Sequence, residues 1–177
     1  MHHRRSIRLA NFDYASEGGY FITIVTHERQ QLFGEIIAGE MRANSYGAVA
    51  REEWFRTAEL RPYVVLFEEE FVVMPNHTHG IISLTGRGTA RRAPTMEEIP
   101  PHEKFGNPVS GSIPTIVRAY KSAVTRRINE IRGAQSFSVW QRNYFEHVIG
   151  HDREYDEIVE YIHSNPRNWT VDDEYLE

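Results

Sequence analysis

The apolar spacing between Ser112 and Gly133 constrains the fold of this chain more than any other feature. Ser112 suits an N-cap, Pro114 is tolerated in a first helical turn, and Gly133 is suited to end a helix. Between them, apolar side chains recur at helical spacings: Ile113, Ile116, Val117, Tyr120, Val124, Ile128 and Ile131. An apolar stripe of this kind is buried against other apolar residues in a folded protein, so the pattern predicts a long helix packed on a core.

Strand-like runs precede and follow this helix. Residues rich in β-branched and aromatic side chains occupy 18–27, 63–67, 70–74, 76–84 and 137–149, and the glutamates between 68 and 70 indicate a turn. Residues 32–47 read as a hairpin that turns near 38–40.

Two further helices complete the pattern. One is predicted over 46–61 and is closed by Pro62; the other begins after Asp152 as N-cap and stops at Asn165-Pro166. The order is strand, hairpin, helix, two strands, helix, strand, helix. It predicts an α+β fold with a mainly antiparallel sheet and the helices packed on one face.

Length and composition suit a single domain over 1–177, with a mobile loop at 85–111 that is rich in Gly, Pro and charge. The absence of cysteine excludes disulfides and thiolate metal sites. No apolar run approaches the length of a membrane span, and the basic start lacks an apolar segment behind it. We therefore expect a soluble cytoplasmic protein without a membrane partner.

The net charge of −5 and the pI near 6.0 argue against a protein that coats nucleic acid through its overall field. Basic residues are nevertheless clustered, at Arg4, Arg5 and Arg8 and again at Arg118, Lys121 and Arg126. A local basic groove and ordinary solvated faces both remain open.

The run FVVMPNHTHGIISL contains two histidines, His77 and His79, two positions apart in a predicted strand. Side chains at i and i+2 project from the same face, so the pair can bind one metal ion if a third ligand comes from elsewhere. The alternative is two polar residues on the solvent side of a sheet.

The last helix carries a second pair. At 100° per residue, Tyr155, Ile158, Val159 and Ile162 form its buried stripe, and Tyr161 lies at the edge of that stripe. Asn165 lies one turn further on, on the same flank as Tyr161. This arrangement would suit a nucleophile at Tyr161 and a metal ligand at Asn165. It would equally suit an ordinary half-buried tyrosine and an Asn-Pro pair that only ends the helix.

Four blocks together resemble the REP-associated tyrosine transposases, a group of single-tyrosine HUH transposases. They are RRSIRLANFDYASEGGYFITIVTHERQQLFGEI, VVMPNHTHGII, VWQRNYFEHVI and EYIHSNPRNW, in that order over most of the chain. One departure is Thr78, where the family usually has a bulky apolar residue between the histidines. Because Thr78 faces the other side of the strand, we expect a packing cost and little effect on a metal.

The resemblance implies a ferredoxin-like or RRM-like palm with a C-terminal helix that carries the nucleophile. Residue by residue, it implies that His77, His79 and Asn165 bind Mg²⁺ or Mn²⁺ and that Tyr161 attacks DNA. The implied activity is cleavage and rejoining of single-stranded DNA at hairpin sequences through a 5′-phosphotyrosine. The arginines and the lysine of the two clusters above are the candidate DNA-binding residues, and both a homodimer and a monomer are compatible with the group.

Two other functions remain open. In a metal-dependent phosphoesterase, the histidines would activate water and Tyr161 would only donate a hydrogen bond. In a catalytically silent protein, the chain would bind DNA hairpins without cutting them. Among the other tyrosines, Tyr120 and Tyr155 lie on core stripes, and Tyr144 is the rival nucleophile.

Overall fold

The computed structural model describes residues 12–86, 109–133 and 136–175. The candidate DNA-binding residues Arg4, Arg5 and Arg8 and most of the predicted loop at 85–111 lie outside these ranges. Within them, no helix is both long enough and apolar enough to cross a bilayer.

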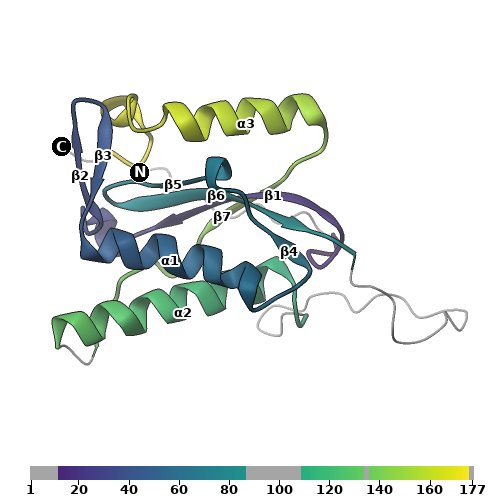
Figure 1. The fold of residues 1–177 in the computed structure, drawn as a ribbon, viewed down its shortest axis with the longest axis horizontal. Helices are drawn as coiled ribbons and strands as arrows, with labels where there is room; N and C mark the ends of the chain where they lie inside the picture. The colour runs from purple at the N-terminus through teal and green to yellow at the C-terminus, as the bar shows by residue number, and fades with distance from the viewer. Residues whose placement is uncertain (1–11, 87–108, 134–135, 176–177) are drawn as a thin grey trace, which may run out of the picture.

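An antiparallel sheet forms the middle layer of the molecule (Figure 1). Its strands are β1 (Gly18–Val25), β4 (Val64–Val65), β5 (Phe71–Val73), β6 (His77–Leu84) and β7 (Phe145–Val148). The order is β4-β6-β1-β7, with β5 also paired to β6, and every neighbouring pair is antiparallel. The α+β class and the mainly antiparallel sheet are thus confirmed.

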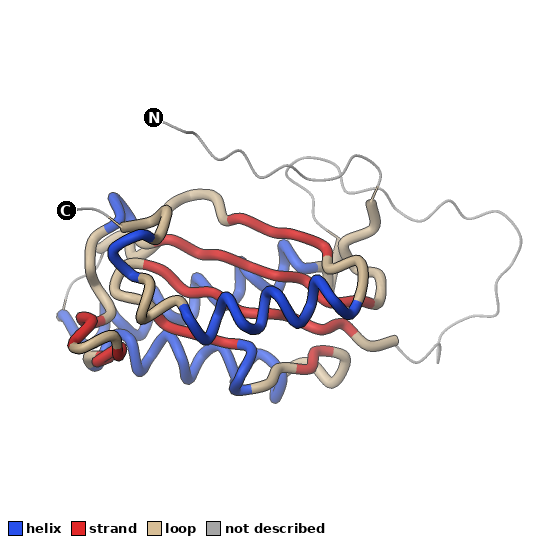
Figure 2. Tube along the Cα trace, turned by 90° about the horizontal axis from the view of Figure 1, so that it is seen from above, coloured by secondary structure: helices blue, strands red, loops and turns tan. Residues whose placement is uncertain are grey.

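The helices cover both faces of this sheet. Helices α1 (Ser45–Glu59) and α2 (Ile113–Arg132) lie on one face, and α3 (Asp152–Ser164) lies along the other (Figures 1 and 2). The prediction that all helices share one face was therefore wrong. The physical reason lies in β6, whose residues are buried at nearly every position instead of alternating, so that both of its sides need cover.

The connectivity explains where the histidines lie. Leaving aside the hairpin, the chain runs β1, α1, β4 and β5, β6, α2, β7, with β1 and β6 in the centre, which is the ferredoxin-like arrangement. The predicted hairpin is β2 (Gly34–Ile37) and β3 (Glu40–Ala43), inserted before α1. Its turn residues Ala38 and Gly39 both have positive φ, as tight hairpin turns require.

The helix ends follow capping chemistry. The side chain of Asn44 accepts hydrogen bonds from the backbone N–H groups of Tyr46 and Gly47 and starts α1, and Gly133 ends α2 at a φ of +62°. The N-cap of α3 is His151, which accepts from the N–H of Glu154, and not Asp152 as predicted.

The main core lies between the sheet and α1 and α2. The predicted α2 stripe is buried there up to Ile128, but Ile131 is 54% exposed because the last turn extends beyond the sheet. In the same layer, the Trp54 ring stacks on Phe71 with centroids 4.6 Å apart. A β-carbon at Gly80 would lie 2.5 Å from Trp54 Cζ2, so a glycine is needed on the strand that carries the histidines.

Candidate active site

The alternation of β6 sends His77 and His79 toward α3, while Thr78 faces the α1 and α2 side. Both imidazoles are buried, with exposed fractions of 0% and 3%. Val25 and Thr23 of the central strand β1 lie opposite them in the register. The common orientation of the pair is confirmed, and the alternative of two solvent-facing polar residues is excluded.

The two imidazoles face each other through their Nε2 atoms, which are 2.9 Å apart. Asn76 Oδ1 lies 2.8 Å from His77 Nδ1, and an amide oxygen can only accept, so His77 Nδ1 carries the proton. The Asn76 orientation is fixed because its Nδ2 donates to the carbonyl oxygen of Glu174 at 2.7 Å. His77 Nε2 therefore presents a lone pair toward the neighbouring ring, as metal-binding histidines do.

His79 is oriented from behind in the same way, since its Nδ1 lies 2.8 Å from Thr23 Oγ1. Burial lowers the pKa of His77 to about 4, although the nearby Asp172 carboxylate acts in the opposite direction. The ring is neutral at pH 7, which is the form that binds a metal ion.

Tyr161 extends from α3 over the histidines. Its side chain is 42% exposed, and its hydroxyl lies 3.2 Å from His79 Nε2. The ring meets His79 and Phe21 edge to face, with centroids 5.1 and 6.1 Å apart. The position of Tyr161 at the edge of the buried stripe is thus confirmed, and its oxygen is directed at the histidine pair.

Asn165 follows one turn later at the end of α3 and is only 2% exposed. Its Nδ2 donates to Asp172 Oδ2 at 2.9 Å, while its Oδ1 is buried and has no hydrogen-bond partner among the described residues. A buried oxygen without a donor is costly unless something electropositive meets it, so this atom fits a cation site.

Asp172 is the residue of this site that the sequence did not reveal. Ligand atoms of His77, His79 and Asp172 lie within 4.8 Å of one another, a group that could hold a metal ion. Asp172 Oδ2 also accepts a hydrogen bond from the Tyr161 hydroxyl at 3.2 Å. Two imidazole nitrogens and carboxylate or amide oxygens form a donor set that suits a divalent metal ion.

Arg29 holds the segment that carries Asp172 against the body of the protein. Its guanidinium pairs with the carboxylate of Glu174 at 2.9 Å and donates to the carbonyl oxygen of Asp173 at 3.1 Å. Just before Asp172, the ring of Trp169 lies 5.9 Å from that of His77. An acidic residue in an irregular segment has no periodicity, so no signal in the sequence placed Asp172 beside the histidines.

The rival tyrosines lie elsewhere. Tyr144 donates to Glu146 Oε2 at 2.6 Å and packs against the core on the α1 and α2 side, away from the histidine face. Tyr120 is buried in the same core, and Tyr155 donates to the carboxylate of Glu70. Of these tyrosines and Tyr161, only Tyr161 is placed at the histidine pair.

The predicted DNA-binding residues of α2 lie on the other side of the sheet from Tyr161. Arg118 and Arg126 are exposed. The ammonium of Lys121 donates to the carbonyl oxygens of Gln141 at 2.6 Å and Arg142 at 3.2 Å, and burial lowers its pKa to about 8. Lys121 thus anchors the segment that leads into β7.

Comparison with known proteins finds similarity both in sequence and in structure. No family model matches the chain. An uncharacterised protein of Haemophilus influenzae is 39% identical over 178 residues, which cover 100% of this chain and 96% of that protein. The chain therefore belongs to one family with the Haemophilus influenzae protein.

The first similar structure is a REP-associated tyrosine transposase bound to a REP hairpin. It has a TM-score of 0.50 and 20% identity, and the match covers 94% of this chain and 73% of the other. The second is a putative transposase of Deinococcus radiodurans, with a TM-score of 0.45, 18% identity and coverage of 88% and 96%. The resemblance seen in the sequence is confirmed at the level of the fold, which this chain shares with the REP-associated tyrosine transposase.

Proposed function

We propose that this chain is a metal-dependent transesterase of single-stranded DNA that cleaves and rejoins strands at hairpin sequences through a 5′-phosphotyrosine. One observation carries the proposal: the Tyr161 hydroxyl lies 3.2 Å from His79 Nε2, which faces His77 Nε2 at 2.9 Å, and Asp172 accepts hydrogen bonds from both Tyr161 and Asn165. Two further findings support it: the four sequence blocks, and a shared fold with a transposase solved on a REP hairpin.

In this proposal His77 and His79 hold a Mg²⁺ or Mn²⁺ ion together with Asp172, Asn165 Oδ1, or both. When bound, the ion would polarise the scissile phosphate and offset the negative charge that develops during the reaction. Asn76 keeps the proton of His77 on Nδ1, so that its Nε2 lone pair stays available, and the Thr23 hydroxyl would do the same for His79 by accepting from Nδ1–H once a metal ion takes the place of the proton between the two Nε2 atoms.

The covalent step belongs to Tyr161. Its phenolic oxygen forms a bond to phosphorus while the bond from phosphorus to the 3′ oxygen breaks, in line with the attack. The phenol proton moves toward Asp172 Oδ2, which already accepts its hydrogen bond, and the leaving oxygen takes a proton from solvent to become a 3′-OH. Because the phosphodiester is exchanged and not hydrolysed, attack by a 3′-OH reverses the step and rejoins the strands.

The exposure of Tyr161 agrees with a large substrate. A side chain that is 42% exposed at the end of a buried histidine pair is accessible to a polymer that cannot enter a closed cavity.

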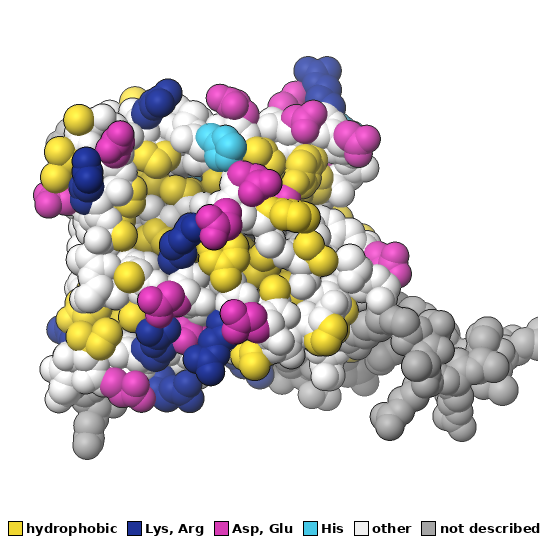
Figure 3. All heavy atoms as spheres, in the orientation of Figure 1, with side chains coloured by type: hydrophobic (Ala, Val, Ile, Leu, Met, Phe, Trp, Pro, Cys, Tyr) yellow, Lys and Arg dark blue, Asp and Glu magenta, His cyan; other side chains and the backbone are white. Residues whose placement is uncertain are grey.

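The net charge of −5 does not prevent DNA binding, because the charges are unevenly distributed. In Figure 3, Lys and Arg side chains gather over α1 and α2, interleaved with acidic ones.

A covalent adduct tests the proposal. Wild type, Tyr161→Phe and Tyr144→Phe would be incubated with labelled hairpin oligonucleotides taken from repeats beside the gene, with Mn²⁺ or Mg²⁺, and separated on a denaturing gel. We expect an adduct that resists detergent in wild type and Tyr144→Phe, and none in Tyr161→Phe or with chelator. Hydrolysed ends without adduct would identify a phosphoesterase, and binding without cleavage would leave a hairpin-recognition protein.

A further inference from the structure

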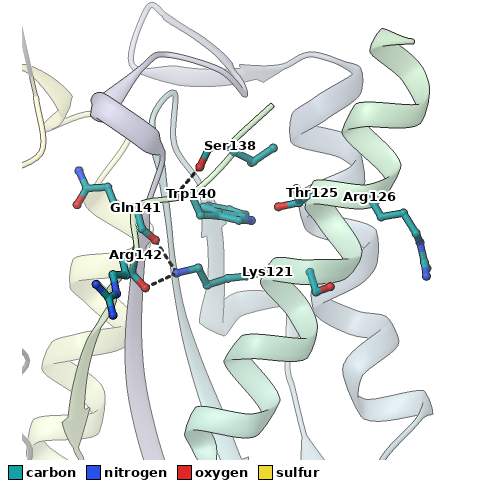
Figure 4. A pocket seen from close by; sticks show the side chains of 9 residues that line it. Lys121, Thr125, Arg126, Ser138, Trp140, Gln141 and Arg142 are labelled. Atoms are coloured by element: carbon teal, nitrogen blue, oxygen red, sulfur yellow. Dashed lines mark hydrogen bonds between the residues drawn. The ribbon is translucent and has the colours of Figure 1, made fainter. Parts of the chain in front are cut away.

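An open pocket of about 480 Å³ lies between α2 and the segment that leads into β7 (Figure 4). Its lining combines the apolar Val139 and the Trp140 ring with polar and basic residues: Lys121, Ser122, Thr125 and Arg126 on α2, and Ser138, Gln141 and Arg142 beside Trp140. The histidine site does not include any of these residues, so the pocket is a separate feature of the molecule.

Trp140 lines this pocket and carries a buried hydrogen-bond donor without a partner among the described residues. The residue is only 6% exposed, and its indole Nε1–H has no acceptor among the described residues. In Figure 4 the nitrogen end of the ring is turned toward α2 at Thr125. A buried indole N–H usually finds a partner, and, unlike Trp54, Trp140 lines a pocket from which a ligand could bring an acceptor.

The faces of the Trp140 ring are already used. The ring packs on Phe33 and Tyr120, with centroids 5.1 and 5.8 Å apart. A nucleobase therefore cannot stack on it, and the edge with the N–H is what remains for a ligand. This argues for an oxygen acceptor and against base stacking at this position.

The charge around the pocket selects the kind of acceptor. Arg126 and Arg142 flank it from opposite sides, and their guanidinium groups extend away from Trp140 in Figure 4. Arg142 has no ion pair within the described ranges, and Arg126 Nε is 4.0 Å from Glu130, a weak contact between two exposed groups. Hydroxyl and N–H donors at the centre, with two long cationic side chains at the rim, match the oxygens of a phosphate.

The pocket lies at the same end of the sheet as the histidines. Trp140 forms an isolated antiparallel β-bridge with Thr26, and the backbone N–H of Gln141 donates to the carbonyl oxygen of Val25. Val25 is in turn the residue of β1 that lies opposite His77. The segment beside the pocket leads into β7, the edge strand next to β1, so the pocket lies near an edge of the sheet. A DNA strand that leaves Tyr161 around this edge would meet the pocket.

We infer that this pocket is a second contact for the DNA strand, in which Trp140 Nε1–H, Thr125, Arg126 and Arg142 bind a backbone phosphate away from the cleaved bond. The assignment of DNA as the ligand rests on the proposed function. Arg126 is thereby placed in a specific site, whereas Lys121 supports the pocket by holding the carbonyl groups of its wall.

Affinity measured against salt tests the charge at the rim. In a Tyr161→Phe background, which leaves only reversible binding, Arg126→Gln/Arg142→Gln would be compared with Arg51→Gln/Arg56→Gln on α1, since both pairs remove two positive charges. We expect the pocket pair to bind the hairpin on the order of tenfold more weakly at low salt and to lower the slope of log K against log salt by about 0.7 or more. Equal effects of the two pairs would overturn the inference.

The indole N–H signals test the pocket itself. The chain has three tryptophans, and Trp140→Phe identifies the signal of Trp140. We expect that signal to shift with the oligonucleotide but not with inorganic phosphate at the same concentration, while Trp54, whose N–H is buried in the core, stays unchanged. No shift at saturation, or an equal shift with phosphate alone, would overturn the inference.

These readouts separate the two proposals. If wild type forms the adduct and the Trp140 signal does not move, the pocket assignment is wrong and the proposed function stands. If the signal moves and no adduct forms, the pocket binds DNA and the covalent chemistry is wrong.

Discussion

The hydroxyl of Tyr161 donates a hydrogen bond to the carboxylate of Asp172 across 3.2 Å. The same oxygen of Asp172 accepts from Asn165 Nδ2 at 2.9 Å. Asp172 therefore connects the residue proposed to attack DNA with the residue proposed to bind the metal, and it does so from a segment that Arg29 holds in place.

Asp172→Asn should weaken Mn²⁺ binding, because it removes the anionic member of the group around His77 and His79. Loss of a group that only supports a metal ligand typically lowers metal affinity by about 10- to 100-fold, so we expect a fall of about tenfold or more here. Titration calorimetry with Mn²⁺ would measure the change. Asp173→Asn is the matched control, since it removes the same charge from the next residue, whose side chain is exposed. Equal affinities in the two variants would leave Asn165 Oδ1 as the third ligand.

Thr23→Val tests whether the hydrogen bond behind His79 matters for the metal. Valine has nearly the same shape as threonine, but it removes the oxygen that lies 2.8 Å from His79 Nδ1. We expect Mn²⁺ affinity to fall by about tenfold and the free energy of unfolding to fall by about 1 kcal/mol.

Thr57→Val provides the comparison. The hydroxyl of Thr57 is also buried and donates to the carbonyl oxygen of Glu53, remote from the histidines. This variant should lose similar stability and keep its metal affinity. If both variants bind Mn²⁺ as wild type does, Thr23 is only a structural contact.

Gly80→Ala should destabilise the strand that carries the histidines. The added methyl group would lie 2.5 Å from Trp54 and 2.8 Å from Phe71, so these stacked rings would have to move. Overpacking of this kind costs about 1 to 3 kcal/mol, which urea denaturation would measure. In Gly19→Ala on β1, the new methyl would meet only the side chain of Ile149, at 3.3 Å, and we expect little change. Equal stability of the two variants would contradict this account.

The sequence predicted the elements that have a period and missed the contacts that do not. The α2 stripe and the alternation of His77 and His79 are periodic, so their burial and direction were predictable. The error at Ile131 has the same origin, because a period continues to the end of a helix whether or not the sheet reaches that far. The position of α3 on the second face depends on which faces the central strands bury, and short-range spacing does not encode this.

The candidate site shows the same division. The spacing of Tyr161 and Asn165 on one helix placed them together, and the resemblance joined them to the histidines. Asp172 lies after a break in the helix, and its position depends on the Arg29 contacts with Asp173 and Glu174. Such long-range contacts between irregular segments leave no pattern in a single sequence.

Glu70 provides a prediction on stability against pH. Its side chain is 1% exposed, one carboxylate oxygen accepts from the Tyr155 hydroxyl, and the other has no partner among the described residues. Burial raises the pKa of Glu70 above its ordinary value of 4.5, although the Tyr155 hydrogen bond opposes this, and burial together with Glu70 raises the pKa of Tyr155 to about 12. The folded state therefore holds the Glu70 proton more tightly than the unfolded state does.

The stability that this proton contributes is complete below about pH 4.5 and is lost as the pH rises through the raised folded value. Glu70→Gln stays neutral, so it does not lose stability in this way. Between pH 4.5 and 7, the free energy of unfolding of the variant should therefore rise relative to that of wild type, by about 1.4 kcal/mol for each unit by which the pKa is raised. Urea denaturation at several pH values measures the difference, with Glu59→Gln at the exposed end of α1 as control. A difference between Glu70→Gln and wild type that does not change with pH would show that the buried carboxyl keeps its ordinary pKa, which would contradict the role of burial assigned to it.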